Sequence, residues 1–202
     1  MSTALPTLYL VRHGETRWSL DGRHTGTTDL ALTHDGETMA RGLEAWFAGL
    51  AFNMVLTSPM RRARDTCELA GLGRSAVISD DLSEWDYGDY EGRTSSEIRT
   101  KEPGWNVFRD GCPGGETPAQ VTQRTDRLIA ELLVVGGNIA LFSHGQFGCA
   151  LAARWIGLAI VEGQHFTLAT GSVSVLGPKP RHPHLAVIDK WNGGPSSQRA
   201  RL

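Results

Sequence analysis

The sequence predicts an α/β protein, a three-layer α/β/α sandwich around a mostly parallel sheet, with an antiparallel edge strand and a small lid insertion. Three observations predict this class. Short apolar runs rich in strand-forming residues recur along the chain, segments with helical spacing separate the first four runs, and two further runs near the C-terminus flank a turn-rich stretch. Strands that alternate with helices pair in parallel, and the final two strands are expected to be antiparallel.

Each expected strand is a short apolar run bounded by polar, glycine or proline residues, as is typical of buried strands. The run Leu8 to Val11 ends at Arg12, and the run Ile139 to Phe142 ends at Ser143. Polar groups therefore follow directly on two of the most apolar runs. The six expected strands, in chain order, are 8–11, 54–56, 76–78, 139–142, 173–176 and 185–188.

The expected helices are recognised by apolar spacing and by signals at their ends. Thr33 or Asp35 is the expected N-cap of the first helix. At Ser58-Pro59, serine is the expected N-cap and proline the first helical residue. The stretch 117–120 reads as a capping box with proline inside it. Helices are expected over 33–49, 59–71, 95–101, 118–135 and 146–156.

The length of 202 residues predicts a single domain over 1–192, followed by a flexible tail over 193–202. Between about 80 and 116 the chain is rich in Gly, Asp, Glu and Trp and shows no sustained period. This segment is too long for an ordinary loop, and long segments of this kind tend to be lids or binding elements. We therefore expect 80–116 to form a lid over the site.

The composition excludes several classes of protein. Forty per cent of the residues are hydrophobic and 21% are charged, which excludes intrinsic disorder and a coiled coil. Twenty Lys and Arg against 22 Asp and Glu leave a charge near neutral, which argues against a nucleic-acid partner. Three cysteines without a CxxC pair indicate reduced thiols. The chain has no cationic leader and no apolar run long enough for a membrane span, so we expect a cytoplasmic protein and no membrane partner.

Two His-Gly pairs follow expected strands, His13-Gly14 after the first and His144-Gly145 after the fourth. Arg12 precedes His13, and Arg61 and Arg62 follow the second strand at the same edge of the sheet. Because ligands bind beyond the carboxyl ends of parallel strands, these groups are expected around one point. Histidines and arginines gathered in this way indicate a site for a dense anion, and phosphate fits the paired donors of a guanidinium.

Other phosphate and hydrolase chemistries are excluded by motif. There is no GxxxxGK[ST] loop, no HExxH and no GxSxG. Neither Cys67 nor Cys149 has an arginine at the spacing of a cysteine phosphatase, and His182-Pro-His184 alone indicates surface residues rather than a metal site. A histidine is therefore the expected nucleophile, and we expect no metal and no cofactor.

Several separated motifs now resemble one family, the phosphoglycerate mutase-like histidine phosphatase superfamily (histidine acid phosphatase superfamily, branch 1). Within it, the sequence is most similar to broad-range acid phosphatases and to sedoheptulose-bisphosphatase-like phosphatases. The resemblance runs from Leu8 to at least Leu176. The motifs that carry it are 8–16, 25–33, 57–63, 82–92, 105–117 and 143–145.

The resemblance implies a metal-independent phosphomonoesterase that hydrolyses small phosphorylated metabolites through a phosphohistidine. It implies that His13 is the nucleophile, that Glu84 is the general acid and base, and that Arg12, Arg62 and His144 surround the transferring group. The small-molecule phosphate monoester is expected to be the partner of the site. The residues implied to line the phosphate and substrate are Ser19, Thr25, Gly26, Tyr87, Gly145 and Gln146.

Two other functions stay open on the sequence. A cofactor-dependent phosphoglycerate mutase is the first, although the mutases carry asparagine at the position of Ser19 and lysine at the position of Ser95. The second is a non-catalytic module that binds phosphorylated ligands. A second phosphate on the substrate is a further open point, for which the candidate cations are Arg93, Lys101 and Arg109. The sequence leaves open whether the chain forms a homodimer.

Overall fold

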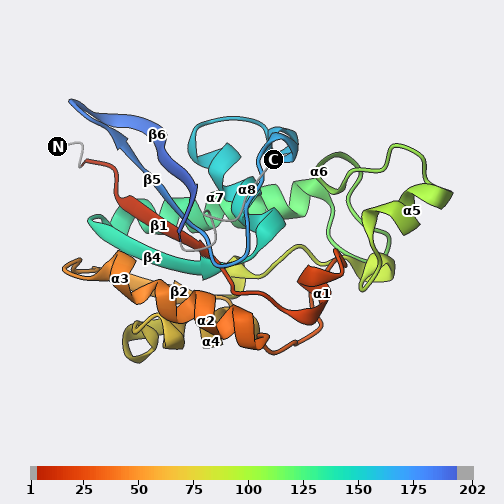
Figure 1. Cartoon of the computed structure of the whole chain (residues 1–202). Coiled ribbons are helices and arrows are strands. Elements are labelled where there is room, and N and C mark those ends of the chain that lie inside the picture. Colours follow the sequence, from red (N-terminus) through yellow and green to blue (C-terminus); the bar gives the residue numbers. More distant parts are fainter. Residues whose placement is uncertain (1–3, 195–202) are drawn as a thin grey trace.

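The structure is a computed structural model that describes residues 4–194. Its centre is a six-stranded sheet in the order β3-β2-β4-β1-β5-β6 (Figure 1). Strands β1 to β4 are mutually parallel, whereas β5 is antiparallel to β1 and β6 is antiparallel to β5. The strands are β1 (Thr7–Arg12), β2 (Met54–Thr57), β3 (Ala76–Ile78), β4 (Asn138–Ser143), β5 (Val173–Lys179) and β6 (His182–Gly193).

This topology confirms the predicted fold class, and it extends the expected antiparallel edge to the two strands β5 and β6. The helices include the five expected from the sequence, the first of them divided into α2 and α3, and two more, α1 and α6, that were not expected. They are α1 (Arg17–Leu20), α2 (His34–Gly42), α3 (Glu44–Phe47), α4 (Arg61–Leu69), α5 (Ser95–Lys101), α6 (Val107–Asp110), α7 (Pro118–Val135) and α8 (Gly145–Trp155). Short 3₁₀ segments are η1 (Gly73–Ser75), η2 (Asp80–Leu82), η3 (Gly88–Tyr90) and η4 (Ile160–His165).

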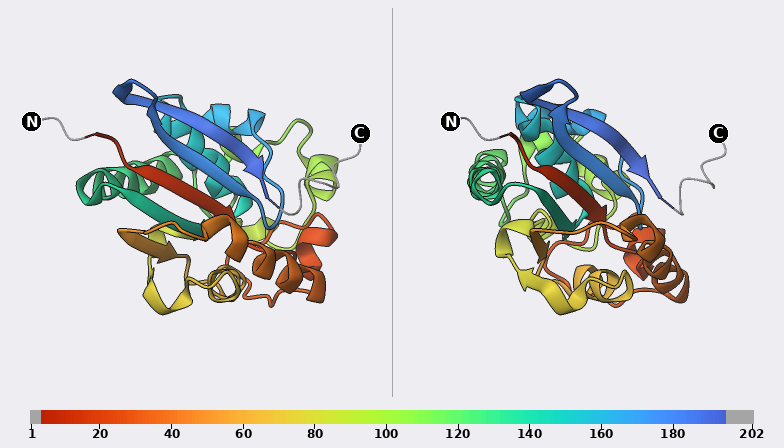
Figure 2. Two further views of the ribbon diagram at one scale, coloured as in Figure 1. Left: turned by 60° about the vertical axis from the view of Figure 1, so that its left-hand side comes forward. Right: turned by 90° about the vertical axis from the view of Figure 1, so that its left-hand side faces the viewer.

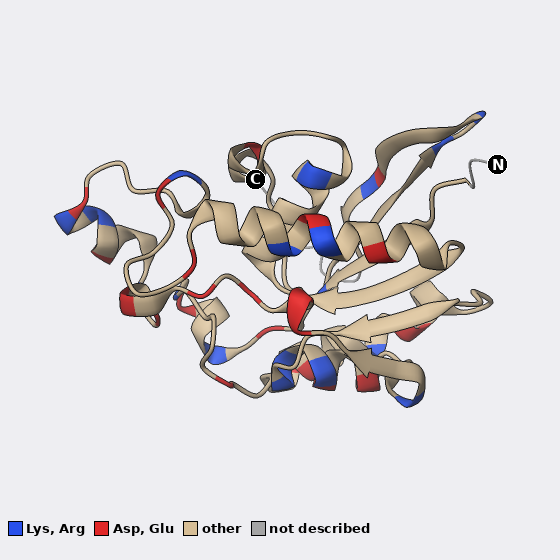
Figure 3. Cartoon of the chain, turned by 180° about the vertical axis from the view of Figure 1, so that it is seen from behind, with Lys and Arg blue, Asp and Glu red and all other residues tan. Residues whose placement is uncertain are grey.

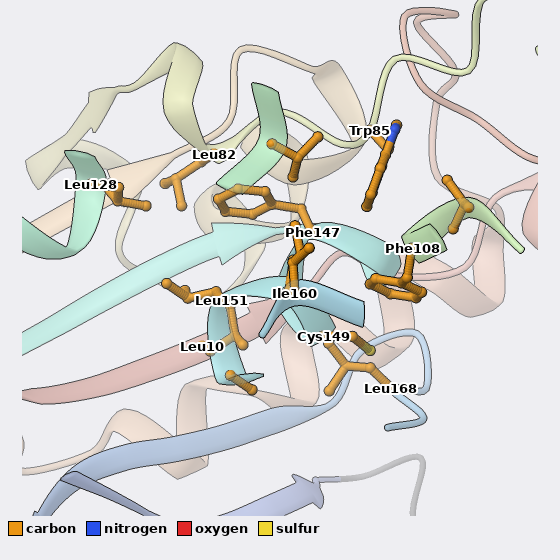
Figure 4. Packing of buried hydrophobic residues seen from close by; sticks show 14 of the residues in the cluster. Leu10, Leu82, Trp85, Phe108, Leu128, Phe147, Cys149, Leu151, Ile160 and Leu168 are labelled. Carbon is orange, nitrogen blue, oxygen red and sulfur yellow. The ribbon is translucent and has the colours of Figure 1, made fainter. Parts of the chain in front are cut away.

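Helices cover both faces of the sheet. Figures 1 and 2 show α2, α3 and α4 on one face and α7 and α8 on the other. Successive side chains of β1 therefore point toward opposite layers of helices. Leu8 and Leu10 belong to the hydrophobic cluster under α7 and α8, and Val11 belongs to the cluster under the opposite helices. Burial on both faces explains why the inner parallel strands β1, β2 and β4 are largely apolar. The edge strand β3 instead exposes Val77 and Ile78. Figure 4 shows Leu151 of α8 in the first cluster.

Two helix boundaries differ from the predicted ones. The helix expected at Ser58-Pro59 begins at Arg61, with Met60 as its N-cap residue. The Ser58 hydroxyl accepts a bond from the Met60 N–H and also contacts His144, so tertiary structure takes the serine away from capping. The helix expected over 33–49 starts after its predicted cap, Thr33, but it is divided into α2 and α3.

The segment 80–116 contains η2, η3, α5 and α6, and it lies at the end of the molecule toward which β1 and β4 point (Figure 1). Its aromatic residues are buried. Trp85, Trp105 and Phe108 belong to the hydrophobic cluster that also contains the buried residues of α7 and α8. The rings of Trp85 and Phe108 pack edge to face with their centroids 5.6 Å apart. We call this segment the lid. Its core is continuous with the main core, so its position relative to the sheet is fixed by packing.

The C-terminal part corrects one expectation. Gly193 was expected to begin the tail, but it ends β6 and pairs with Val173 of β5. The rest of the expected tail, residues 195–202, lies outside the described residues. Within residues 4–194 no helix has the length and apolar character needed to cross a membrane. Seen from behind, acidic and basic residues interleave on helices and loops while the strands carry few charges (Figure 3).

Candidate active site

The two predicted histidines are neighbours because their strands are neighbours. β1 and β4 pair in parallel with Arg12 opposite Ser143, and His13 and His144 follow directly. The His13 N–H donates to the Ser143 carbonyl at 3.0 Å, and the centroids of the two imidazole rings are 5.2 Å apart. The convergence expected at the carboxyl edge of the sheet is therefore present for both histidines.

The ring of His13 is fixed in one tautomer. Its Nδ1 lies 2.7 Å from the Gly14 carbonyl oxygen, which can only accept, so Nδ1 carries the proton. Burial lowers the pKa of His13 well below its usual value, and the positive charges of Arg62 and Arg12 lower it further. The ring is therefore neutral, and its Nε2 keeps a free lone pair. This is the state that a nucleophilic histidine requires.

His144 is held in the opposite tautomer. The Nε–H of Arg62 donates to Nδ1 of His144 at 3.1 Å, so that Nδ1 accepts and the ring proton is on Nε2. Nε2 then donates to the Ser58 hydroxyl at 2.7 Å. Burial and the charge of Arg62 lower the pKa of His144 well below its usual value, which keeps the ring neutral.

Arg62 also ties down the loop after α1. Its terminal nitrogens donate to the carbonyl oxygens of Thr25, Gly26 and Thr28, each at 3.0 Å. From the other side, the Glu91 carboxylate of the lid accepts the N–H groups of Gly26 and Thr28. Gly26 sits where a Cβ would be 2.6 Å from the Trp85 carbonyl oxygen, so the close approach of loop and lid requires glycine there.

The Glu84 carboxylate extends from the lid to the N-terminal end of α8. It accepts the N–H groups of Trp85, Gln146 and Phe147 at 2.7 to 3.0 Å, and only 8% of the residue is exposed. The positive end of a helix attracts a carboxylate. This set of donors brings the lid residue Glu84 to the same edge of the sheet as the two histidines.

Arg12 has an incomplete set of hydrogen bonds. Its Nη1 donates to the Leu168 carbonyl, while its Nε is buried and has no hydrogen-bond partner among the described residues. Burial lowers the pKa of the guanidinium, and the charge of Glu84 partly opposes that effect. Gly145 makes room for the group, because a Cβ there would lie 3.2 Å from Cζ of Arg12. A buried cation with a spare donor is suited to binding an anion.

A cavity of about 350 Å³ opens over these groups. Eight of the predicted residues line it: Arg12, His13, Ser19, Thr25, Glu84, Tyr87, Gly145 and Gln146. Gly26 does not line it and lies in the loop beside it. Arg62 and His144 are completely buried and are also absent from its wall. Their direct contact with a transferring group therefore stays a prediction, and their observed contacts are with protein groups.

Sequence reasoning missed several residues of the cavity. Arg23 and His24 directly precede the motif 25–33, so their position next to that motif was an available signal. The segment 166–168 also lines the cavity, but it carries no motif and reaches the site only through the fold. His24 stacks on Tyr87 with ring centroids 4.6 Å apart, and its Nε2 lies 3.1 Å from the Ser95 hydroxyl.

The cysteines are free, as the sequence predicted, and all three are buried. One of them, Cys149, lines the cavity close to Glu84 and Arg12. Burial raises the pKa of the Cys149 thiol to about 12, so the thiol stays protonated. A protonated thiol is a poor nucleophile, which favours His13 for that role. In the described part of the chain, no three His, Cys, Asp or Glu side chains gather as a metal centre would require.

Comparison with known proteins identifies the class. The sequence model of the histidine phosphatase superfamily (branch 1) matches residues 8–191. An acid phosphatase of Mycobacterium tuberculosis is 42% identical over 185 residues, which are 90% of this chain and 91% of that protein. A sedoheptulose 1,7-bisphosphatase of Saccharomyces cerevisiae is 38% identical over 192 residues, covering 79% and 71% of the two chains.

The fold agrees with that comparison. A solved structure of an open reading frame product from Mycobacterium tuberculosis superposes with a TM-score of 0.83 at 40% identity, covering 93% of this chain and 99% of that one. The chain belongs to the histidine phosphatase superfamily, branch 1. It is a phosphatase, a hydrolase of phosphoric monoesters similar to acid phosphatases. A probable phosphoglycerate mutase of Cronobacter sakazakii is also similar, at 32% identity over 83% of this chain and 82% of that protein.

Proposed function

We propose that the enzyme hydrolyses small phosphorylated metabolites, such as sugar phosphates, through a phosphohistidine on His13 and without a metal ion. One observation carries the proposal. The bond from Nδ1 to the Gly14 carbonyl leaves Nε2 of a neutral His13 as a lone-pair donor in a cavity that Arg12 and Glu84 also line. The cavity volume of about 350 Å³ suits a small-molecule ligand.

In the first step, Nε2 of His13 attacks the phosphorus atom, and the bond from phosphorus to the ester oxygen breaks. The Glu84 carboxyl gives its proton to the leaving oxygen, which departs as an alcohol. Arg12 supports this step, because its guanidinium offers donors to the equatorial oxygens of the phosphoryl group. The products are a phosphohistidine and a Glu84 carboxylate.

In the second step, the Glu84 carboxylate takes a proton from water, and the water oxygen attacks the phosphohistidine. The bond between phosphorus and Nε2 breaks, and inorganic phosphate leaves. His13 returns to its neutral form and Glu84 to its protonated form. The network of Arg62, His144 and Ser58 has a supporting role, because it fixes the floor beneath these groups.

Trapping the phosphoenzyme and measuring its stability in acid and in alkali tests the intermediate. Enzyme mixed with ³²P-labelled substrate and quenched within milliseconds should carry label that survives alkali and is lost in acid, as a phosphoramidate does. The label should map to the peptide that contains His13 and should be missing from His13→Ala, which should retain the fold by circular dichroism. Label on another residue, or turnover of 4-nitrophenyl phosphate by His13→Ala at the original rate, contradicts the proposal.

The metal-independent chemistry has its own test. We expect the guanidinium of Arg12 to meet the negative charge on the transferring group, so EDTA should leave the hydrolysis rate unchanged. A loss of rate that added divalent metal restores would contradict this part of the proposal.

A phosphoglycerate mutase is the second candidate, because a probable mutase is among the similar proteins. Ser95 favours hydrolysis: the mutases have lysine there, whereas here the hydroxyl pairs with His24 at 3.1 Å. Incubation with 3-phosphoglycerate distinguishes the two functions. A phosphatase releases inorganic phosphate in proportion to substrate lost, whereas a mutase, primed with 2,3-bisphosphoglycerate, accumulates 2-phosphoglycerate.

We infer a cytoplasmic enzyme whose partner is its small-molecule substrate, with no nucleic acid and no membrane as partners. The proposed domain extends through Gly193, the last residue of β6, with the lid as an insertion over about 80–116. A homodimer and a monomer are distinguished by sedimentation velocity on the purified chain.

A further inference from the structure

A second cavity adjoins the first on the lid side of His24. Its volume is about 150 Å³, room for on the order of five waters at the liquid volume of each. His24, Ser95, Gln146 and Phe166 line both cavities. The four shared wall residues place the second cavity directly beside the cavity that His13 lines.

The second cavity has one charged residue in its wall. Arg99 of α5 lines it, and no aspartate or glutamate does. The Nε–H of Arg99 donates to the Trp105 carbonyl at 3.0 Å, which orients the guanidinium. Within residues 4–194 its two terminal nitrogens have no hydrogen-bond partner. An oriented guanidinium with two unused nitrogens is suited to the oxygens of a phosphate or carboxylate.

The groups around Arg99 are polar but uncharged. His24 is neutral, because burial lowers its pKa to about 4; Glu91 opposes this shift and the positive charge of Arg99 adds to it. The side chains of Asn106 and Gln164 pair with each other at 3.1 Å in the same wall. These amides offer hydrogen bonds to hydroxyl groups without competing for an anion.

We propose that the second cavity binds the organic part of the substrate and that Arg99 binds a second anionic group on it. Preferred substrates are then phosphomonoesters that also carry a phosphate or a carboxylate. This inference rests on the proposed function, since it assumes that the first cavity holds the phosphoryl group that is transferred. Arg99 acts in the selection of substrate and has no part in the bond-breaking steps.

The cations suggested by the sequence for a second phosphate do not occupy this place. Arg93, Lys101 and Arg109 line neither cavity. Arg109 is already paired with Asp110 at 2.7 Å. Lys101 is on the same helix as Arg99 and is exposed, so Lys101→Gln is a matched control for removing a positive charge from α5.

Steady-state kinetics of Arg99→Gln test the subsite with three substrates: fructose 1,6-bisphosphate, 3-phosphoglycerate and 4-nitrophenyl phosphate. For a doubly anionic substrate, kcat/KM should fall about tenfold more than for the aryl phosphate, as expected for losing a hydrogen bond to a charged group. Comparison of the first two substrates shows whether phosphate or carboxylate is preferred. Lys101→Gln should leave the ratios within about twofold.

Equal losses for all three substrates, or no loss, overturn the subsite while leaving the phosphatase proposal intact. Failure of the wild-type enzyme to hydrolyse any of them would contradict the proposed function. In that case calorimetric binding of fructose 1,6-bisphosphate to His13→Ala, with and without Arg99→Gln, still tests the subsite. About tenfold weaker binding of the double variant supports it, and unchanged affinity overturns it.

Discussion

Arg62 donates a 3.1 Å hydrogen bond from Nε to Nδ1 of His144, and both side chains are completely buried. Among the described residues, Arg62 has one of the largest fully buried side chains, and its other donors go to backbone carbonyls of the loop after α1. One side chain thus sets the tautomer of the second histidine and the position of the loop that lines the cavity.

Removal of Arg62 should damage stability as well as activity. Arg62→Met leaves the buried Nδ1 of His144 and the buried carbonyl oxygen of Gly26 without donors, and each such group costs about 1–3 kcal/mol. The half-buried carbonyl oxygens of Thr25 and Thr28 also lose their donor. Urea denaturation should show a loss of at least about 3 kcal/mol in the free energy of unfolding.

The neighbouring Arg61→Met is the matched control. Its guanidinium is exposed and pairs with Asp65 one helical turn away, an arrangement worth less than about 0.5 kcal/mol. Equal losses of stability in the two variants would contradict the structural role of Arg62.

Glu84→Gln should separate the two steps of the reaction. The amide keeps one oxygen for the N–H donors of α8 but can neither give nor take the catalytic proton. We expect hydrolysis of an alkyl phosphate, with its poor leaving group, to fall by about 10²- to 10⁴-fold. Hydrolysis of 4-nitrophenyl phosphate should slow mainly in the second step, so phosphohistidine should accumulate in quenched samples.

A control for Glu84→Gln is Glu162→Gln, because Glu162 is in η4 and pairs with His165 away from the cavity. It should retain the wild-type rate for both substrates. If Glu84→Gln lowered the rates of the alkyl and aryl substrates equally and no phosphoenzyme accumulated, the acid–base assignment would be wrong.

The protonation of His13 should be insensitive to mild acid. Burial and the nearby charges of Arg62 and Arg12 lower its pKa well below the usual value near 6.5. A lowered pKa means that the neutral, nucleophilic ring persists as the pH falls from 7 to 5, where an ordinary histidine would become charged. The NMR signals of the His13 ring, assigned by their loss in His13→Asn, should keep the chemical shifts of a neutral imidazole over this range. A titration midpoint anywhere above pH 5 would contradict the prediction.

Gly26→Ala should disturb the contact between loop and lid. The new Cβ would lie 2.6 Å from the Trp85 carbonyl oxygen and 2.9 Å from the Glu91 carboxylate, so the loop must move. Overpacking of this kind costs about 1–3 kcal/mol, and thermal unfolding should detect it. Gly177→Ala is the comparison, because its Cβ would meet β1 at an ordinary 3.5 Å. Equal melting temperatures of the two variants would contradict the role assigned to Gly26.

The apolar runs predicted all six strands because each strand carries a short, local apolar pattern that is read directly from the sequence. The pattern did not show that β3 and β6 would be largely exposed, because exposure depends on which strands lie at the edge of the sheet. The cap at Thr33 and the capping box at 117–120 were also local, and both are present. The start of α4 was wrong for the opposite reason. Ser58 has a distant partner, His144, and this tertiary bond outweighs its local preference for a cap.

Within the site, the sequence alone determined that each of the two histidines follows a parallel strand. This was possible because each histidine stands two residues after the end of an apolar run that predicts a strand. Only the tertiary structure decided that Arg62 and His144 lie behind the cavity, that Glu91 holds the loop from the lid side, and that 166–168 completes the wall. These relationships join residues far apart in the chain. Side-chain packing fixes them, and no periodicity or motif encodes which distant donor meets which acceptor.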